Sequence, residues 1–447
     1  MNISVFGMGL VGLSTGISFA EVGNNVCCVD KSPQKIRLLK DGIATVYEPQ
    51  LEGLLKTNLL AKRVSFTQDI QAAVNFAKLL FITVGTTFEE SGQITTNEVD
   101  QVVKDIAEYI YEDKILVCKS TVPVGTSQAL EAKINNFLRL RNCSAKVVVL
   151  SNPEFLKSGT AIADSLKPER VIVGSRSPES TKVMRQLYKP ALQKDSSFLE
   201  MSTQSAELTK LAANAFLATK VAFINEFSRV CEKVGADVED LRRALGSDSR
   251  IGAQHLSPSL GYSGSCLPKD LSALLNLSQS VSQDMPIVKG VKESNEQQLK
   301  YFFNKLLKHF KNDLTTKQIT VWGLTFKPDT SDTRNSPVKT FLKYLVENEA
   351  RVKVYDPVVT KLSDIDTYGA NIELCTEAYR SLEGSDALCL CTDWRHFKEL
   401  NFNKIKQGLK APVIFDGRNL WSPRRLLAEG FTYYSIGRDS LCDENEL

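Results

Sequence analysis

The stretch ISVFGMGLVG at residues 3–12 decides the fold of this chain. Its first half is a short run of β-branched and aromatic residues, typical of a buried strand, and the run breaks into glycines where a helix pattern begins. The next strand pattern, NNVCCVD, ends in Asp30. A strand, a helix and a second strand in this order predict a βαβ unit at the start of the chain.

The strand patterns continue in the same style through the first part of the chain. They occupy residues 79–85, 114–120, 146–155 and 170–174, with helical stretches between most of them. Strands that alternate with helices predict a parallel, doubly wound sheet, which is an α/β fold of the Rossmann type.

The opening pattern returns after about residue 315. QITVWGLTFKPD is a strand pattern that breaks at Gly323, SPVKTFLKYLVENEA is a helix pattern, and RVKVYDP is a strand pattern that ends in Asp356. Later strands are expected at residues 386–393 and 412–419. We therefore predict a second Rossmann-like, doubly wound domain in the last third of the chain.

A long helix pattern runs from Ser202 to Gly235, where a C-cap glycine belongs. Apolar residues occur on most of its faces, so the helix must be buried inside the chain or against a partner chain. We predict that it joins the two α/β domains and contributes to a homodimer interface. The expected parts are residues 1–198, a helical dimerisation region at 199–297, and residues 298–447.

Composition describes an ordinary globular protein. The 447 residues are 43% hydrophobic and 24% charged, and the net charge of +3 excludes the strongly basic surface of a nucleic-acid-binding protein. We expect no signal peptide and no membrane span. The cysteines form no CxxC pair or Cys/His cluster, which argues against zinc and a disulfide framework and favours a reducing cytoplasm.

The glycines of the first stretch predict a cofactor site. Gly7, Gly9 and Gly12 form G-x-G-x-x-G between a strand and a helix, with Asp30 at the end of the next strand. Such glycines let backbone N–H groups approach a pyrophosphate, and the carboxylate accepts bonds from an adenosine ribose. The same charge repels a 2′-phosphate, so NAD is favoured over NADP. A glycine turn that binds FAD, another nucleotide or nothing is the alternative.

The stretch GYSGSCLPKD at residues 261–270 sets Cys266 among glycines, a proline and charges. A structural cysteine and a nucleophile are both open interpretations, and nearby Lys269 would favour a thiolate. A dehydrogenase has a specific use for such a thiol. Addition to an aldehyde gives a thiohemiacetal, a second oxidation gives a thioester, and water releases the acid.

Several motifs together resemble the UDP-glucose/GDP-mannose dehydrogenase family. They are FGMGLVG, KSTVPVGT, NPEFLKSGTAIAD, KPERVIVG, ELTKLAANAFLATKVAFINE, GYSGSCLPKD and LTFKPDTSDTRNSP, spread in order over nearly the whole chain. The resemblance implies a four-electron oxidation of a nucleotide sugar at C6 with two NAD⁺ reduced. It makes residues 1–198 an NAD-binding domain and residues 298–447 a domain that binds the nucleotide sugar, and it favours the nucleophile for Cys266.

The resemblance also assigns site residues by matched position. Asp270 would help activate the hydrolytic water, Lys210 and Asn214 would stabilise oxyanion charge and position water, and Glu154 would act as acid/base or water-orienting group. The implied catalytic residues are Cys266, Asp270, Lys210, Asn214, Glu154 and Thr121. The implied cofactor-binding residues are Gly7, Gly9, Leu10, Val11, Gly12, Asp30, Lys35, Thr86, Thr121, Lys269 and Arg334. The implied substrate-binding residues are Glu154, Phe155, Leu156, Lys157, Lys210, Asn214, Arg250, Tyr262, Gly264, Lys327 and Arg418.

The implied substrate is UDP-glucose, because Ser265 precedes the cysteine and LPKD follows it. Arg250 resembles an arginine that reaches the site of the partner in a homodimer. Two departures from the family pattern, Ser158 and Thr87, concern the cofactor side. Oxidation of GDP-mannose or a UDP-N-acetylamino sugar, a non-catalytic nucleotide-sugar-binding homologue, and a 6-phosphogluconate-type two-electron dehydrogenase are the alternatives.

Overall fold

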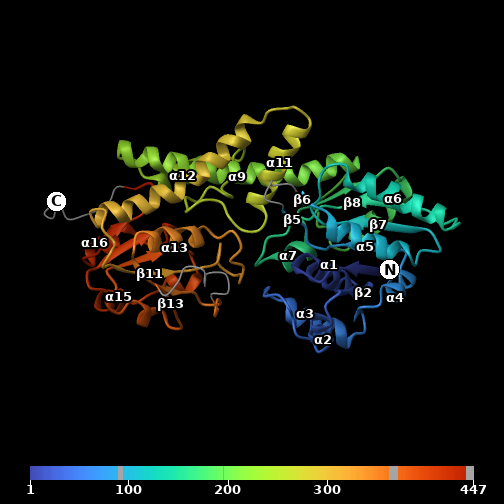
Figure 1. Cartoon of the computed structure of the whole chain (residues 1–447), viewed down its shortest axis with the longest axis horizontal. Helices are drawn as coiled ribbons and strands as arrows, with labels where there is room; N and C mark the ends of the chain where they lie inside the picture. The colour runs from blue at the N-terminus through green and yellow to red at the C-terminus, as the bar shows by residue number, and fades with distance from the viewer. Residues whose placement is uncertain (89–93, 195, 362–370, 439–447) are drawn as a thin grey trace. The chain divides into compact units, whose positions relative to one another are not determined.

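The computed structural model describes residues 1–88, 94–194, 196–361 and 371–438 (Figure 1). The chain forms two units, Met1–Ala213 and Asn214–Leu447. Helix α9, Thr203–Val234, begins in the first unit and ends in the second, close to the bounds predicted from the sequence. Its predicted C-cap glycine, Gly235, has the positive φ of +70° that such a position requires.

The first unit is built on an eight-stranded sheet with the order β10-β9-β8-β7-β4-β1-β2-β3. Six neighbouring strands of this sheet, in the order β3-β2-β1-β4-β7-β8, are all parallel. Renumbered along the chain, they have the order 3-2-1-4-5-6 of a Rossmann fold. The strands of this sheet are β1 (Asn2–Phe6), β2 (Asn25–Val29), β3 (Val64–Thr67), β4 (Leu79–Ile82), β7 (Lys114–Cys118), β8 (Val147–Ser151), β9 (Arg170–Gly174) and β10 (Ser197–Met201). A separate short pair is formed by β5 (Thr87–Phe88) and β6 (Ile94–Thr95).

The prediction of a wholly parallel first sheet is wrong at β9. This strand meets β8 in antiparallel register at Ser151 and Gly174. It begins with Arg170 over the ring of Phe155, 4.3 Å from the ring centroid, and therefore starts beyond the carboxyl end of β8. Because the connection does not cross back over the sheet, β9 has to run in the opposite direction.

Helices cover both faces of the first sheet. Ile3 and Val5 of β1 pack into one apolar core with residues of α1, whereas Phe6 packs into the core on the other face with residues of α5 and α6. This alternation follows from the two-residue period of a strand. The helices are α1 (Leu10–Glu21), α2 (Pro33–Lys40), α3 (Leu51–Leu60), α4 (Ile70–Phe76), α5 (Asn97–Ala107), α6 (Thr126–Leu140), α7 (Ala161–Leu166) and α8 (Pro178–Tyr188).

The second unit contains a six-stranded parallel sheet with the order β13-β12-β11-β14-β15-β16. This is again the order 3-2-1-4-5-6, so the prediction of a second Rossmann-like sheet is confirmed. Its strands are β11 (Gln318–Trp322), β12 (Arg351–Tyr355), β13 (Ile372–Cys375), β14 (Ala387–Leu390), β15 (Val413–Asp416) and β16 (Thr432–Tyr434). Its helices after α9 are α10 (Val238–Ser247), α11 (Leu267–Ser280), α12 (Pro286–His309), α13 (Pro337–Glu347), α14 (Ala378–Ser381), α15 (Phe402–Gly408) and α16 (Pro423–Ala428), with a 3₁₀ turn, η2, at Arg395–Phe397.

The turn after the first strand of the first sheet is held by two hydrogen bonds. The N–H of Gly7 donates to the carbonyl of Val29 at 2.8 Å, and the N–H of Met8 donates to Oδ2 of Asp30 at 2.8 Å. Gly7 has a φ of +101°, which a residue with a side chain rarely adopts. Asp30 therefore fixes the glycine turn from the end of the neighbouring strand.

The same turn recurs after the first strand of the second sheet. The N–H of Gly323 donates to the carbonyl of Tyr355 at 2.8 Å, and the N–H of Leu324 donates to Oδ2 of Asp356 at 2.8 Å. The sequence likeness between the two segments therefore reflects one repeated hydrogen-bond pattern. Unlike Asp30, Asp356 also accepts a hydrogen bond from an indole, that of Trp394, at 3.2 Å.

Helix α9 is apolar on most of its faces, as predicted. Ala206, Leu211, Ala218 and Ile224 are buried within the chain. A second set of its apolar residues is exposed in the single chain, namely Leu208, Phe216, Phe223, Phe227, Val230 and Val234. Within the described residues, no helix combines the length and apolar character that crossing a membrane requires.

We predict that Gly323→Ala lowers the free energy of unfolding of the second sheet by about 2–4 kcal/mol. The φ of +90° disfavours alanine, and an added Cβ would lie 2.4 Å from Cβ of Thr392. Urea unfolding followed by tryptophan fluorescence measures this, because the three tryptophans of the chain all lie in the core of this sheet.

The matched control is Gly290→Ala in the interior of α12, where an added Cβ meets nothing within 4 Å. Alanine there should raise the free energy of unfolding by roughly 0.5–1 kcal/mol, because it costs less backbone entropy than glycine. Equal effects of the two substitutions would contradict the proposed importance of the turn.

Candidate active site

The N-terminus of α1 has the shape of a phosphate cradle. Gly12 lies so close to the turn that an added Cβ would be 1.8 Å from the carbonyl oxygen of Gly7. Gly9, the N-cap of α1, faces open space instead, because an added Cβ would meet nothing within 4 Å. Leu10 and Val11 follow as the first two residues of the helix. A free helix N-terminus next to a glycine turn is the arrangement that binds the pyrophosphate of a dinucleotide.

Asp30 lies at the carboxyl end of β2, beside this turn. Its Oδ1 accepts a hydrogen bond from the N–H of Ser32 at 2.9 Å, and its Oδ2 accepts from Met8 and lies 3.5 Å from Nζ of Lys35. The carboxylate is thus fixed in place at the edge where Rossmann folds bind the adenosine ribose. The residues present fit NAD, which would supply the hydride acceptor when bound.

Two threonines expected on the cofactor side lie on neighbouring loops. Oγ1 of Thr86, after β4, donates to the carbonyl of Thr121, after β7, at 3.0 Å. The hydroxyl of Ser120 ties the same loops together through the carbonyl of Val84 at 2.6 Å. These loops follow strands β4 and β7, on the far side of the switch point from β2, where the ligands of such sheets bind.

Glu154 and Lys210 form a buried ion pair in the first unit. Nζ of Lys210 on α9 lies 3.0 Å from Oε1 of Glu154, and the two side chains are 5% and 9% exposed. Oε2 of Glu154 accepts a hydrogen bond from the N–H of Leu156 at 2.6 Å. Burial alone raises the pKa of Glu154, but the charge of Lys210 and these hydrogen bonds outweigh it and hold the pKa below its ordinary value. Glu154 is therefore ionised at neutral pH.

The remaining residues of the NPEFLK stretch pack around this pair. The ring of Phe155 lies 5.3 Å from Nζ of Lys210, measured to its centroid. The N–H of Lys157 donates to Asp164 at 3.0 Å, and its Nζ lies 3.5 Å from the same carboxylate. The structure therefore brings Glu154, Phe155, Leu156 and Lys210 together, and places Lys157 in a separate contact.

Cys266 lies in the second unit, where it is the N-cap of α11 and is exposed. The loop before it is clamped to the TRNSP segment, because Gly264 donates its N–H to the carbonyl of Asn335 at 3.4 Å and accepts from its Nδ2 at 3.3 Å. Gly264 has a φ of +85°, and an added Cβ would lie 2.9 Å from the ring of Phe326. The thiol is thus presented on a shaped loop at the N-terminus of α11, where the helix dipole is positive.

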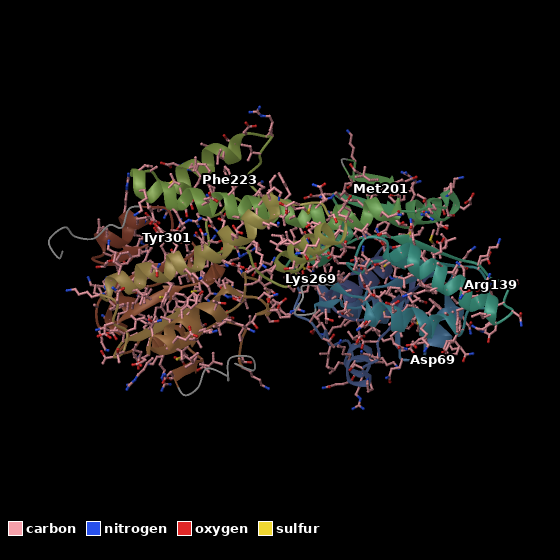
Figure 2. All side chains as sticks on the ribbon, turned by 45° about the horizontal axis from the view of Figure 1, so that its top comes forward. Asp69, Arg139, Met201, Phe223, Lys269 and Tyr301 are labelled. Carbon is pink, nitrogen blue, oxygen red and sulfur yellow. The ribbon has the colours of Figure 1, made fainter. Side chains whose placement is uncertain are left out.

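Asp270 is buried one turn after the cysteine. Its N–H donates to the carbonyl of Cys266 at 2.9 Å, and its Oδ2 accepts a hydrogen bond from Nδ2 of Asn214 at 2.5 Å. Nζ of Lys269, labelled in Figure 2, lies 3.9 Å from its other oxygen. Asn214 and Asp270, which the resemblance named separately, therefore contact each other next to the cysteine loop.

The resemblance assigns two arginines, Arg250 and Arg334, to contacts with bound ligands. In the structure each forms an ion pair with an aspartate two positions before it in the sequence. Arg250 makes hydrogen bonds to both carboxylate oxygens of Asp248, and its side chain is 87% exposed. Arg334 contacts both oxygens of Asp332 in the same way. A contact of Arg250 with a partner subunit, and of Arg334 with a cofactor, stay predictions.

The other expected substrate ligands lie on loops of the second unit. Tyr262 is buried and held through its backbone by the side chain of Asn295. Lys327 has its Nζ 5.8 Å from the ring centroid of Phe326. Arg418 donates to the carbonyl of Phe326 at 2.8 Å, so it braces the loop that carries Lys327. Their contacts with a substrate stay predictions.

Sequence reasoning missed four polar residues that make tertiary contacts around these side chains and loops. Asn335 holds the cysteine loop, and Glu207 on α9 accepts hydrogen bonds from the backbone N–H groups of Gly125 and Ser127 at the start of α6. Lys119 and Asn152 contact each other beside Glu154's loop. Each of the four lies inside or beside a quoted motif, but only tertiary contacts show what it holds. They are Lys119, Asn152, Glu207 and Asn335.

We predict that Glu154→Gln lowers the free energy of unfolding by about 3 kcal/mol at pH 7, because it removes the carboxylate of a buried ion pair with Lys210. The folded-state pKa of Glu154 is lowered, so its contribution is complete above its unfolded-state pKa of about 4.3 and is lost as the pH falls through the folded value. Urea unfolding of both proteins between pH 7 and pH 3 should show this difference shrinking.

The control is Glu52→Gln, because Glu52 forms an exposed pair with Lys56 on the surface of α3. Its substitution should change the free energy of unfolding far less. A Glu154→Gln effect that is small or independent of pH would refute the ion pair as a source of stability.

Comparison with known proteins agrees with the domain order that the two sheets indicate. Three domain models of the UDP-glucose/GDP-mannose dehydrogenase family match in order: the NAD binding domain at residues 1–192, the central domain at 204–297 and the UDP binding domain at 320–423. A UDP-glucose 6-dehydrogenase of Bacillus subtilis, TuaD, is 40% identical over 98% of this chain and 94% of its own length. A UDP-glucose 6-dehydrogenase of Pseudomonas aeruginosa is 39% identical over 98% of both chains.

Among solved structures, a UDP-glucose dehydrogenase from the archaeon Pyrobaculum islandicum matches with a TM-score of 0.88 and 30% identity, over 98% of both chains. The same family is indicated by the glycine turn with Asp30, by the strand order that the two sheets share, and by relatives that match nearly the full length. The chain therefore belongs to the UDP-glucose/GDP-mannose dehydrogenase family and is an NAD-dependent dehydrogenase.

Proposed function

We propose that this chain oxidises UDP-glucose at C6 to UDP-glucuronate and reduces two NAD⁺ for each sugar. The observation that carries the proposal is the exposed Cys266 at the N-terminus of α11, with the buried pair of Asp270 and Asn214 one turn away. The names of the two bacterial relatives support UDP-glucose as the sugar. The proposal assigns roles to side chains of both units.

In the first oxidation, the C6 alcohol loses a hydride to NAD⁺ and a proton to a base, and becomes an aldehyde. Glu154 is ionised and is our candidate for this base or for orienting the water that takes the proton. The ammonium of Lys210 stabilises the alkoxide that develops as the proton leaves.

In the second oxidation, the thiolate of Cys266 adds to the aldehyde carbon, and the oxygen takes up a proton to give a thiohemiacetal. The thiohemiacetal then loses the hydroxyl proton to a base and its remaining hydride to a second NAD⁺, which leaves a thioester. Water then adds to the thioester carbon and Asp270 accepts one proton from it. Breakage of the C–S bond releases the thiolate and the carboxylic acid, which loses its proton to solvent. Asn214, which is hydrogen bonded to Asp270, holds this carboxylate in place.

We predict two NADH per UDP-glucose consumed. Cys266→Ser should lower the rate of acid formation by a factor on the order of 10³ or more, because a serine hydroxyl is a far weaker nucleophile than a thiolate. NADH absorbance and the yield of UDP-glucuronate measure both quantities, and Cys375→Ser on β13 is the control that should keep normal activity.

The same assay with GDP-mannose and UDP-N-acetylglucosamine decides between substrates. One NADH per sugar, or full activity of Cys266→Ser, would contradict the thioester route. Turnover of another nucleotide sugar in preference to UDP-glucose would replace the substrate, and turnover of none would favour a non-catalytic binding protein.

We also propose that the chain forms a homodimer through α9. Phe216, Phe223, Phe227, Val230 and Val234 are spaced seven, four, three and four residues apart and are all exposed in the single chain. This spacing puts them on one side of a helix, and the ring of Phe223, labelled in Figure 2, packs against that of Phe227 with 4.6 Å between centroids and a tilt of 38°. An exposed apolar stripe of this size favours burial against a second copy. The expected reach of Arg250 into the partner's site belongs to the same proposal.

We predict that Phe223→Glu converts the dimer to a monomer, because it would bury a charge in the centre of the stripe. Light scattering after size-exclusion chromatography measures the mass in solution. Leu140→Glu, at an exposed apolar position on α6, is the control and should leave the mass unchanged. A monomeric wild-type protein would contradict the proposal.

A further inference from the structure

Lys119 is a buried cation to which the reaction described above gives no role. It follows β7 directly, is 8% exposed, and its Nζ lies 3.3 Å from Oδ1 of Asn152 and 3.4 Å from the hydroxyl of Tyr188. Both of these hydrogen-bonding partners are neutral. The pKa of Lys119 is lowered to about 8, chiefly by burial; the charge of Glu154 opposes this shift and the charge of Lys210 adds to it.

Asn152 connects Lys119 to the turn that carries Glu154. Oδ1 of Asn152 also accepts a hydrogen bond from the hydroxyl of Tyr188 at 2.7 Å, and its Nδ2 donates to the carbonyl of Ile172 at 2.8 Å. Its side chain is therefore fixed on both sides, two residues before Glu154 in the sequence. Lys119 therefore adds a third contact to the side chain at which this turn begins.

Lys119 and Lys210 place two positive charges near the carboxylate of Glu154. Two buried ammonium groups, of Lys119 and Lys210, both interact with the carboxylate of Glu154, and Lys210 contacts it at 3.0 Å. Burial raises the pKa of Tyr188, so its hydroxyl stays neutral and contributes no compensating charge. The positive charge of Lys119 therefore acts on Glu154 in the same direction as that of Lys210.

We propose that Lys119 is a positioning residue of the active site, whose charge keeps Glu154 ionised and whose hydrogen bond to Asn152 fixes the turn that carries it. The inference rests on the proposed function, in which Glu154 and Lys210 act on the C6 alcohol. It predicts an effect on the acid side of the pH profile, where Glu154 takes up its proton.

The test compares Lys119→Met, Lys119→Gln and Lys119→Arg with the wild type in UDP-glucose oxidation. In both neutral variants we expect kcat to fall and the acid limb of the kcat profile to move to higher pH by about 0.5 to 1 unit, because Glu154 loses one stabilising cation. Lys119→Arg keeps the charge and should keep the limb in place. Lys119→Gln retains a polar side chain, so it serves if the methionine variant does not fold.

Tyr188→Phe is the matched control, because it removes the hydroxyl that contacts Lys119 but leaves the charge. It should leave the acid limb unchanged. An acid limb that stays in place in both neutral variants would overturn the proposal and leave Lys119 with a structural role only.

A second readout does not depend on the substrate. The pH at which Glu154 loses its stabilising effect, obtained from unfolding of Glu154→Gln in the wild-type and Lys119→Gln backgrounds, should move upward by the same amount. If this shift occurs but UDP-glucose is not oxidised, the proposed function fails and the coupling of Lys119 to Glu154 stands. If UDP-glucose is oxidised but neither shift occurs, only the role of Lys119 is wrong.

Discussion

The hydrogen bond from the residue after a glycine to an aspartate on the next strand is the constraint on which both sheets depend. Met8 donates to Asp30, and Leu324 donates to Asp356, each at 2.8 Å. Each bond ties the end of the first strand to the end of the second, at the edge where the strand order reverses. It therefore sets the start of the helix or loop that follows, and with it the position of any ligand bound there.

The two turns differ in how many protein groups donate hydrogen bonds to their aspartates. Asp356 accepts hydrogen bonds from the backbone of Val358 and Val359 and from the indole of Trp394, so protein donors crowd both of its oxygens. Asp30 has no tryptophan over it and lies next to Lys35. One repeated backbone pattern thus supports a dinucleotide cradle in the first sheet, whereas in the second sheet it holds the loop that carries Lys327.

The sequence predicts those parts of the fold that local patterns encode. The glycine turn with Asp30, the return of the same pattern near Gly323 and the long central helix all depend on residues close together in the chain. The direction of β9 depends instead on the path of the connection before it, and the strand Ser197–Met201 is mostly exposed and has no apolar pattern to reveal it. The proposed catalytic residues came from the family motifs, but the burial of Lys119 is a tertiary property. In the sequence it looks like any lysine at the end of a strand.

Helix α9 shows why one helix can serve both units. Glu207, Lys210 and Asn214 are spaced three and four residues apart, which puts three polar groups on one side of a largely apolar helix. Glu207 caps the start of α6, and Lys210 forms its ion pair with Glu154, both within the first unit. Asn214 holds Asp270 within the second. Because a helix fixes these spacings, a substitution that bends α9 between residues 207 and 214 would disturb the loop after β7, the buried carboxylate and the aspartate next to the cysteine at the same time.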